Sequence, residues 1–149
     1  MSANENHYKR DAIISQRHRS WGFDCPAMDV DFMLIEYDRL KAIAIIDYKH
    51  ENSTINTNSA GARVMANLAD RAGIIACIVV YGHSEYDKNG LWAAPTENSD
   101  MWFNVIPLNA EAIERQPRKQ KLTEVEYVSW LYDTRGRVIP AKLAWQLGQ

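Results

Sequence analysis

The 149-residue chain has no excess of positive charge, because 17 lysines and arginines stand against 19 aspartates and glutamates. A surface that is basic throughout is therefore excluded, and any contact with nucleic acid must come from local groups of cations. Apolar residues make up 46% and charged residues 24% of the sequence, which is typical of a globular domain and not of a disordered chain. We expect one domain over residues 1–149.

Several functional classes lack the residues they need. Cys25 and Cys77 are the two cysteines and form no C-x-x-C pair, so a zinc finger or a thioredoxin-like redox motif is not supported. The seven glycines form no phosphate-binding loop, and no Gly-x-Ser-x-Gly motif marks a serine nucleophile. The longest apolar run, 74–81, is far shorter than the ~20 residues that cross a bilayer, and the polar start resembles no targeting peptide. We therefore expect a cytoplasmic protein that does not enter a membrane.

The apolar periodicity and the turn-forming residues predict a mixed α/β fold. A hairpin followed by a helical crossover and another strand implies a mixed sheet with helices on its faces. The helix over 60–72 has Val64, Met65 and Leu68 at helical spacing and ends at Gly73. We expect helices over 7–19, 60–72, 109–115, 124–133 and 140–147, and strands over 30–37, 42–49, 74–81, 91–94 and 101–108.

Capping and stop signals support the helices near the C-terminus. Thr123 and Glu126 form a capping-box pattern, and Gly136 stops the helix that follows it. Pro140 suits the first turn of the last helix. We expect a core over roughly residues 10–108 and a helical extension over 109–149.

Two acids and a lysine occupy the predicted hairpin. Asp31 lies at the start of the first strand, and Asp47 and Lys49 lie at the end of the second. Side chains alternate between the faces of a strand, so Asp47 and Lys49 share a face. Charges at the end of an apolar strand are costly unless they are paired, metal-bound or at an edge. These residues are therefore candidates for a site.

The register of the hairpin decides whether Asp31 joins the other two. All three side chains share a face only if the numbers of opposed residues add to an even sum, as when Tyr37 lies opposite Lys41. A two-residue turn at 39–40 gives an odd sum and separates the acids, unless a bulge shifts the register. The sequence leaves both registers open.

Two carboxylates and a lysine at one point suit metal-dependent cleavage of a phosphodiester. Carboxylates hold a hard cation such as Mg²⁺ or Mn²⁺. The cation lowers the pKa of a bound water and stabilises charge on the phosphate. The lysine can orient the attacking water or bind the developing oxyanion.

The pattern Asp31…Asp47-Tyr48-Lys49 on a hairpin, with a helix before it and a helix–strand unit after it, resembles the PD-(D/E)XK nuclease superfamily. That group includes restriction endonucleases, Holliday-junction resolvases and RecB-type nuclease domains. The resemblance covers about residues 10–81. It implies a restriction-endonuclease-like αββαβ core with extra C-terminal helices, and a small Mg²⁺-dependent endonuclease or resolvase-like enzyme that acts on DNA.

The resemblance also implies a role for each residue. Asp31 corresponds to the first metal ligand, Asp47 to the second and Lys49 to the catalytic lysine. The main-chain carbonyl of Tyr48 is a further ligand. Asp29 competes with Asp31 for the first role, and the Gln-x-x-x-Tyr signature of RecB-type nucleases is missing from the helix over 60–72.

Cations at three places are candidates for contact with nucleic-acid phosphates. Arg17 and Arg19 flank His18 at the end of the first helix; His18 is either an accessory ligand or, with the arginines, a favourable charge at a helix C-terminus. The basic loop contributes Arg115, Arg118, Lys119 and Lys121, and a second group consists of Arg135 and Arg137. Either group is otherwise a solvated surface.

Three functional hypotheses remain open. The first is a nuclease that works as a homodimer, since a domain of this size benefits from a second copy when it holds a duplex. The second is a nuclease-like module that has lost catalysis and binds DNA or a protein partner. The third is a structural protein in which Asp47 and Lys49 are only a surface pair.

Overall fold

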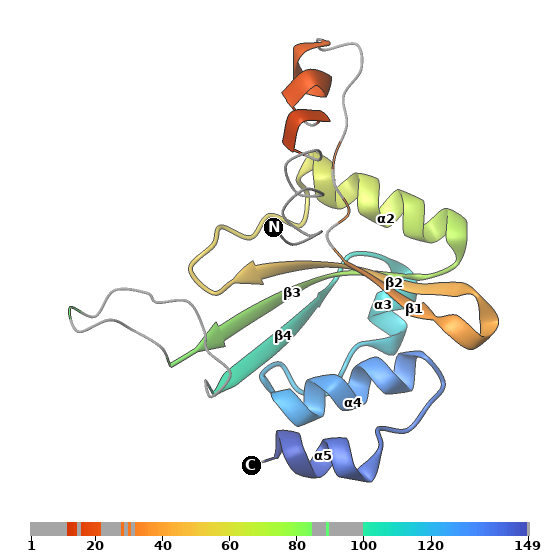
Figure 1. The fold of residues 1–149 in the computed structure, drawn as a ribbon, viewed down its shortest axis with the longest axis vertical. Coiled ribbons are helices and arrows are strands. Elements are labelled where there is room, and N and C mark those ends of the chain that lie inside the picture. The colour runs from red at the N-terminus through yellow and green to blue at the C-terminus, as the bar shows by residue number, and fades with distance from the viewer. Residues whose placement is uncertain are drawn as a thin grey trace, which may run out of the picture.

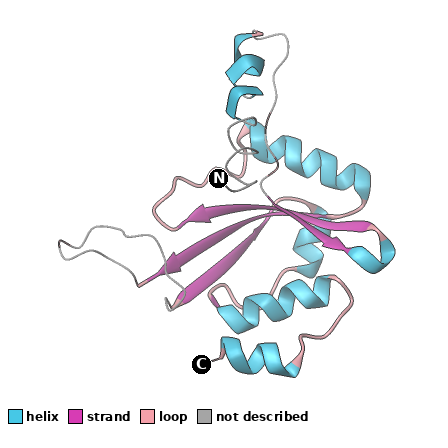
Figure 2. Cartoon of the chain, in the orientation of Figure 1, coloured by secondary structure: helices cyan, strands magenta, loops and turns pink. Residues whose placement is uncertain are grey.

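A computed structural model of the protein describes residues 12–14, 16–21, 28, 30, 32–84, 89 and 100–148. Helices pack on both faces of a five-stranded sheet (Figures 1 and 2). The elements are β1 (Phe32–Glu36), the 3-10 turn η1 (Tyr37–Arg39), β2 (Lys41–His50), α2 (Ala60–Ala72), β3 (Ile75–His83), β4 (Met101–Pro107), α3 (Ala110–Arg115), β5 (Leu122–Thr123), α4 (Glu124–Thr134) and α5 (Ala141–Leu147). Residues 12–14 and 16–20 are also helical.

The strands follow one another across the sheet in the order β1-β2-β3-β4-β5. The β2–β3 pair is parallel, and the other three pairs are antiparallel. Helix α2 makes the crossover between the two parallel strands, as a parallel connection requires. The expected mixed sheet with a hairpin, a helical crossover and flanking helices is therefore confirmed at this level.

The two faces of the sheet have separate apolar cores. The larger core, on the side of α3 and α4, includes Ile46, Val79 and Phe103 with Tyr127 and Trp130 of α4. The smaller core, under α2, consists of Ile45, Met65, Ala69 and Ala76. The C-terminal helices thus complete the main core, and α5 lies on the outer side of α4 (Figure 1).

The buried side of α2 differs from the prediction. Spacing alone favoured Val64 and Leu68 as core residues, but their side chains are 53% and 45% exposed. The helix instead buries Ala62, Met65 and Ala69. Ala62, Met65 and Ala69 therefore form the contact with the sheet, and the small alanine side chains leave room for the helix backbone to lie close to it. The two glycine stops are confirmed, since Gly73 and Gly136 adopt left-handed backbone with φ of 71° and 70°.

The ends of several other elements differ from the predicted ones. β3 continues to His83, two residues beyond the predicted end, because pairing with β4 extends that far. β5 was not predicted, since its two residues carry no periodicity. Pro140 occupies the N-cap position of α5, just before the first turn in which it was predicted, and its side chain makes no capping hydrogen bond. The predicted strand over 91–94 and part of the predicted helix over 7–19 lie outside the described residues.

Asn109 joins α2, β3 and α3. Its Oδ1 accepts hydrogen bonds from the backbone N–H groups of Ala76 (3.1 Å) and Ala112 (3.0 Å), which caps α3. Its Nδ2 donates to the Ile74 carbonyl at 2.9 Å and to Asp70 Oδ1 at 3.1 Å. Asn109 is 6% exposed, and its bonds to the N–H groups of Ala76 and Ala112 are buried, so these two groups depend on Asn109 for a partner.

We expect Asn109→Ala to lower the free energy of unfolding by about 2 kcal/mol, because it removes a cap and leaves buried polar groups unsatisfied. Chemical unfolding followed by circular dichroism measures the change. Asn67→Ala, at an exposed position of α2, is the control and should stay close to the parent chain. Equal stability of the two variants would contradict the role of Asn109.

Glu36 ties the end of β1 to the segment that follows α4. Its side chain is 1% exposed. Arg137 donates to both carboxylate oxygens, with Nε–Oε2 at 2.7 Å and Nη2–Oε1 at 2.8 Å. Arg135 Nε lies 3.3 Å from Oε2, and the backbone N–H of Asp38 lies 3.4 Å from Oε1. The hydrogen bonds from Arg137 are the main reason that the pKa of Glu36 falls from 4.5 to about 2, against the opposing effect of burial.

This lowered pKa makes the fold sensitive to acid. A carboxylate with a depressed folded-state pKa contributes stability above its unfolded pKa of 4.5 and loses it as the pH falls towards 2. We expect Glu36→Gln to lower the melting temperature by several degrees at pH 7, and the gap to the parent chain to shrink between pH 4.5 and pH 2.

Melting curves at pH 7, 5, 3.5 and 2.5 test this expectation. Glu114→Gln, an exposed carboxylate on α3, is the matched control and should follow the parent chain at each pH. A gap between Glu36→Gln and the parent chain that stays constant down to pH 2.5 would contradict it.

Candidate active site

Asp47 and Lys49 project from the same face of β2, near the end of a strand whose preceding residues are buried. Ala44, Ile45 and Ile46 are at most 3% exposed. The side chain of Asp47 is 22% exposed and that of Lys49 is 42% exposed, and Lys49 Nζ lies 3.6 Å from Asp47 Oδ2. The strand thus leads from the core directly to an ion pair that solvent reaches.

A bulge in β2 sets the register of the hairpin. Next to the turn, Glu36 pairs with Lys41 and Ile35 with Ala42, which is the odd sum that separates the acids. The register then shifts between Leu34 and Ile35, and Phe32 pairs with Ile46, an even sum. The extra residue on β2 is Ile43. The described part of the ladder therefore ends in the register that the shared-face arrangement requires. Asp31 and Asp29 themselves lie outside the described residues.

A cavity of about 380 Å³ opens beside Asp47 and Lys49, between β2, β3 and the start of α2. The loop that precedes α2 brings polar groups to it, and Met65 and Ile78 form an apolar side. The lining residues are Met28, Ile46, Asp47, Lys49, Thr54, Ile55, Asn56, Ser59, Gly61, Ala62, Met65 and Ile78. Asp47 and Lys49 therefore share a concave, solvent-accessible space with hydroxyl and amide oxygens.

The loop is held by its own hydrogen bonds. Ser59 caps α2 by accepting from the Ala62 N–H at 3.2 Å, and Asn56 Oδ1 accepts from the Asn58 N–H at 3.0 Å. Sequence reasoning treated these residues mainly as loop formers, and their hydrogen bonds support that role. Ser59 and Asn56 also line the cavity. Predicting this from the sequence would require the path of the loop relative to β2.

The donor chemistry of this cavity fits a hard cation. Asp47 supplies a carboxylate and Thr54 a neutral oxygen, and the lining includes no thiolate or imidazole among the described residues. Mg²⁺ is commonly held by one or two carboxylates with water and substrate phosphate completing the shell. Within the described part of the chain, no three His, Cys, Asp or Glu side chains form a group that could hold a metal by themselves.

The side chain of Tyr48 points away from the candidate site. Its hydroxyl lies 2.6 Å from that of Tyr127 on the other side of the sheet, and its ring meets Phe32 edge-on at 4.9 Å. Burial raises the pKa of both tyrosines. The side chain of Tyr48 is therefore not available to the face that carries Asp47. On the far side of the sheet, burial also raises the pKa of the Cys77 thiol to about 12, which suits a core residue and not a nucleophile.

The helical residues 16–20 carry the candidate cations of the N-terminal region. Arg17 and Arg19 are exposed, and the His18 ring lies 5.0 Å from the ring of Trp21. None of these three residues lines the cavity beside Asp47. Trp21 is 60% exposed.

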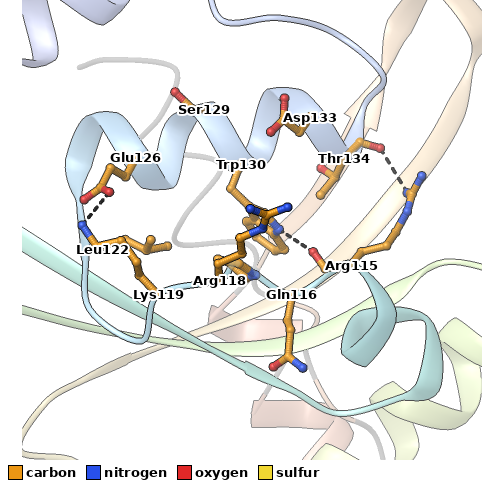
Figure 3. A pocket seen from close by; sticks show the side chains of 11 residues that line it. Arg115, Gln116, Arg118, Lys119, Leu122, Glu126, Ser129, Trp130, Asp133 and Thr134 are labelled. Atoms are coloured by element: carbon orange, nitrogen blue, oxygen red, sulfur yellow. Dashed lines mark hydrogen bonds and ion pairs between the residues drawn. The ribbon is translucent and has the colours of Figure 1, made fainter.

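The basic loop between α3 and α4 borders another cavity, of about 560 Å³ (Figure 3). Arg118 is exposed there. Lys119 Nζ lies 2.7 Å from Glu126 Oε2, and Arg115 Nη1 donates to the Thr134 carbonyl at 3.4 Å. Lys121 lies apart, with Nζ 5.0 Å from the centre of the Trp102 ring. The four cations are thus spread over the loop, and they differ in how far internal partners neutralise them.

The second predicted basic group has a structural role. Arg135 and Arg137 both bind Glu36, and Arg137 also pairs with Asp38. Sequence reasoning could not foresee this, because Glu36 and Arg137 are 101 residues apart.

Two histidines meet at the ends of β2 and β3. The rings of His50 and His83 are 5.2 Å apart, and His83 is 4% exposed. His83 lies two residues beyond the predicted end of its strand and belongs to β3. The alternation of Val79, Tyr81 and His83 was the available signal. Both histidines lie on the face opposite to Lys49.

Comparison of the chain with models of protein families, with curated proteins and with solved structures finds no match. No helix in the described ranges is both long and apolar enough to span a membrane. The function is therefore inferred from the residues of this chain and from their geometry.

Proposed function

We propose that the protein is a metal-dependent phosphodiesterase that cleaves nucleic acid, with DNA as its preferred substrate. The observation that carries this proposal is the pairing of Asp47 with Lys49, 3.6 Å apart, at the wall of a solvent-accessible cavity. An anion-binding lysine next to a metal-binding carboxylate is an arrangement suited to attack on a phosphodiester.

The hairpin register supports Asp31 as the second carboxylate. Phe32 pairs with Ile46 after the bulge, so the described ladder ends in the even-sum register, which is the register required if Asp31 is to share a face with Asp47. Directly opposed residues on antiparallel strands share a face, with Cβ atoms about 4.5–5.5 Å apart. Asp29 is the alternative ligand.

The order of elements also supports a nuclease-like core. A helical segment precedes the β1–β2 hairpin, and α2 then leads to β3, which runs parallel to β2. This order is the αββαβ order that the resemblance to the PD-(D/E)XK superfamily implies. The two C-terminal strands and the three C-terminal helices then support this core.

Each residue then has a defined task. Asp47 and Asp31 hold Mg²⁺ or Mn²⁺, with the Tyr48 carbonyl as a further oxygen ligand. The bound cation supplies a Lewis acid that activates water and offsets charge on the phosphate. Lys49 lies beside Asp47, where its ammonium can orient the attacking water or bind the developing oxyanion.

We expect Asp47→Asn and Lys49→Ala each to reduce Mg²⁺-dependent cleavage of DNA by about 10²–10³-fold, because each removes a charge that acts on the reacting phosphate. Asp31→Asn should have a similar effect, and Asp29→Asn a small one. Cleavage of labelled linear and branched DNA, measured with and without Mg²⁺, tests these expectations.

Two variants serve as matched controls. Lys142→Ala removes an exposed lysine on α5, far from β2 in the sequence, and Asp133→Asn removes an exposed carboxylate on α4. Both should cleave at the rate of the parent chain. Cleavage that survives Asp47→Asn and Lys49→Ala would refute the assigned roles. A parent chain that binds DNA or Mg²⁺ and cuts none of the substrates would favour the module without catalysis.

The outer edge of β1 supports a homodimer. Phe32, Met33 and Ile35 are 57%, 48% and 37% exposed, and no described strand pairs with this edge. Natural edge strands usually carry charges, prolines or bulges that prevent pairing. Here the only charged residue of β1, Glu36, is buried and bound to Arg137, and the extra residue of the bulge lies on β2. We propose antiparallel pairing of two β1 strands about a two-fold axis, where no like charges would oppose each other.

We expect the parent chain to have twice the 17.1 kDa mass of one chain in light scattering, and Ile35→Lys to shift it to a monomer. Val64→Lys, which adds the same charge at an exposed apolar position of α2, should leave the dimer intact. A monomeric parent chain, or equal dissociation by both variants, would refute pairing through β1. Circular dichroism checks that each variant is folded.

A further inference from the structure

A separate cavity lies at the opposite end of β2 from Asp47 and Lys49. It has a volume of about 550 Å³ and lies where β2 and β3 begin and where α2 and α4 end. We call it the basic cavity. Its lining residues are Arg39, Lys41, Ala42, Ile43, Ala72, Gly73, Ile74, Ile75, Glu111, Arg115, Thr134, Arg135 and Gly136.

Positive charge is concentrated in the basic cavity. Four cations from four segments of the chain line it, and among the lining residues Glu111 is the one carboxylate. One of the four, Arg135, is also paired with Glu36, which lies outside the lining, so the excess charge comes from the other three. The chain as a whole has a net charge of −2, so this local excess does not follow from composition. The four cations are Arg39, Lys41, Arg115 and Arg135.

Two of the guanidinium groups are oriented without losing their charge. Arg39 Nη2 donates to the carbonyl of Arg135 at 2.8 Å, and Arg115 Nη1 donates to the carbonyl of Thr134 at 3.4 Å. A carbonyl orients a guanidinium but does not neutralise it. The contact between Arg115 Nε and Glu111 Oε1 is long, at 3.7 Å, and joins two half-exposed groups, so it screens little of the charge.

A purely structural role explains only part of this arrangement. Cations near a helix C-terminus interact favourably with its free carbonyls, and the bonds of Arg39 and Arg115 to the end of α4 are of this kind. Each of these bonds uses one of the five N–H donors of its arginine. Lys41 is exposed and has no partner among the described residues. Charge and donors therefore remain for a ligand.

The chemistry of the lining indicates the class of ligand. The volume lies within the range of small-molecule sites. The lining includes no aromatic ring among the described residues, so nothing there stacks on a base, and the recognition must act on an anionic group. Guanidinium forks match the oxygens of phosphate and bind them with charge-assisted hydrogen bonds. We propose that the basic cavity binds the phosphate or polyphosphate group of a small molecule.

This site is distinct from the proposed active site. Lys41 and Lys49 are eight residues apart on one extended strand, which corresponds to about 26 Å at ~3.3 Å per residue. A pyrophosphate ion cannot span that distance. Binding in the basic cavity therefore neither requires nor demonstrates cleavage at Asp47, and either proposal can fail alone.

Isothermal titration of the full chain with pyrophosphate, without divalent metal, tests the proposal. We expect saturable binding that weakens at least about tenfold in the double variant Arg39→Ala with Lys41→Ala, because two charged donors are lost. Both residues are exposed, so the variant should fold, and circular dichroism verifies this. Arg115→Ala should weaken binding as well.

Charge-matched variants show where the ion binds. Arg118→Ala, in the cavity of Figure 3, and Arg63→Ala, on the exposed side of α2, should bind pyrophosphate as the parent chain does. A parallel titration with ATP identifies the source: tighter binding than pyrophosphate indicates a nucleotide, and equal binding indicates the polyphosphate group alone.

Three results would overturn the proposal. One is the absence of saturable binding. Another is an equal loss in Arg118→Ala or Arg63→Ala, which shows non-specific attraction or binding elsewhere. The third is loss in Lys49→Ala with retention in the Arg39 and Lys41 double variant, which assigns the ion to the candidate active site.

Discussion

The candidate active site depends on a single extra residue in β2. Side chains on a strand alternate between its faces, so a shift of one position in the β1–β2 ladder exchanges the two faces of β1 relative to β2. Next to the turn the pairing has the odd sum, and Ile43 shifts it to the even sum before the ladder reaches Phe32. Without the bulge, position 31 would oppose Ile46, which belongs to the core under α4. The bulge is thus the condition on which a shared acidic site rests.

The turn that makes the bulge necessary is itself held by distant residues. Leu40 adopts a left-handed conformation with φ of 52°, which is unfavourable for a residue other than glycine. The neighbouring Glu36 is bound by Arg135 and Arg137, which follow α4. Because these bonds fix the turn end of the hairpin, the C-terminal segment helps to set the geometry of β1 and β2. The helices after residue 109 are therefore part of the framework of the site.

The sequence predicts elements that depend on local signals. The capping box at Thr123 and Glu126, the glycine stop at Gly73 and the two hairpin strands are all present, because each depends on residues close in the chain. Helical spacing did not identify which side of α2 is buried. That side carries Ala62, Met65 and Ala69, and it depends on how the helix packs against the sheet. Pairing over long separations, such as Glu36 with Arg137, leaves no local pattern to detect.

The candidate site divides in the same way. That Asp47 and Lys49 share a face follows from alternation alone, and the structure agrees. Predicting the register requires knowledge of the bulge, and the apolar residues on both sides of Ile43 give no sign of it in the sequence. Predicting the cavity beside Asp47 requires the path of the loop before α2. Predicting the basic cavity requires knowing that four separate segments of the chain meet there.

The distribution of charge along β2 connects these features. The strand starts at Lys41, beside Arg39 and Arg115, which share one carboxylate of the lining, and beside Arg135, which is paired with Glu36. Near its other end lie Asp47 and Lys49, whose charges cancel. A cation at Asp47 would therefore add positive charge at the end of the strand that is locally neutral. Phosphate groups would then meet a favourable potential at both ends of β2, although the whole chain carries a net charge of −2. In this molecule the location of the charges, and not their sum, decides whether a polyanion can bind.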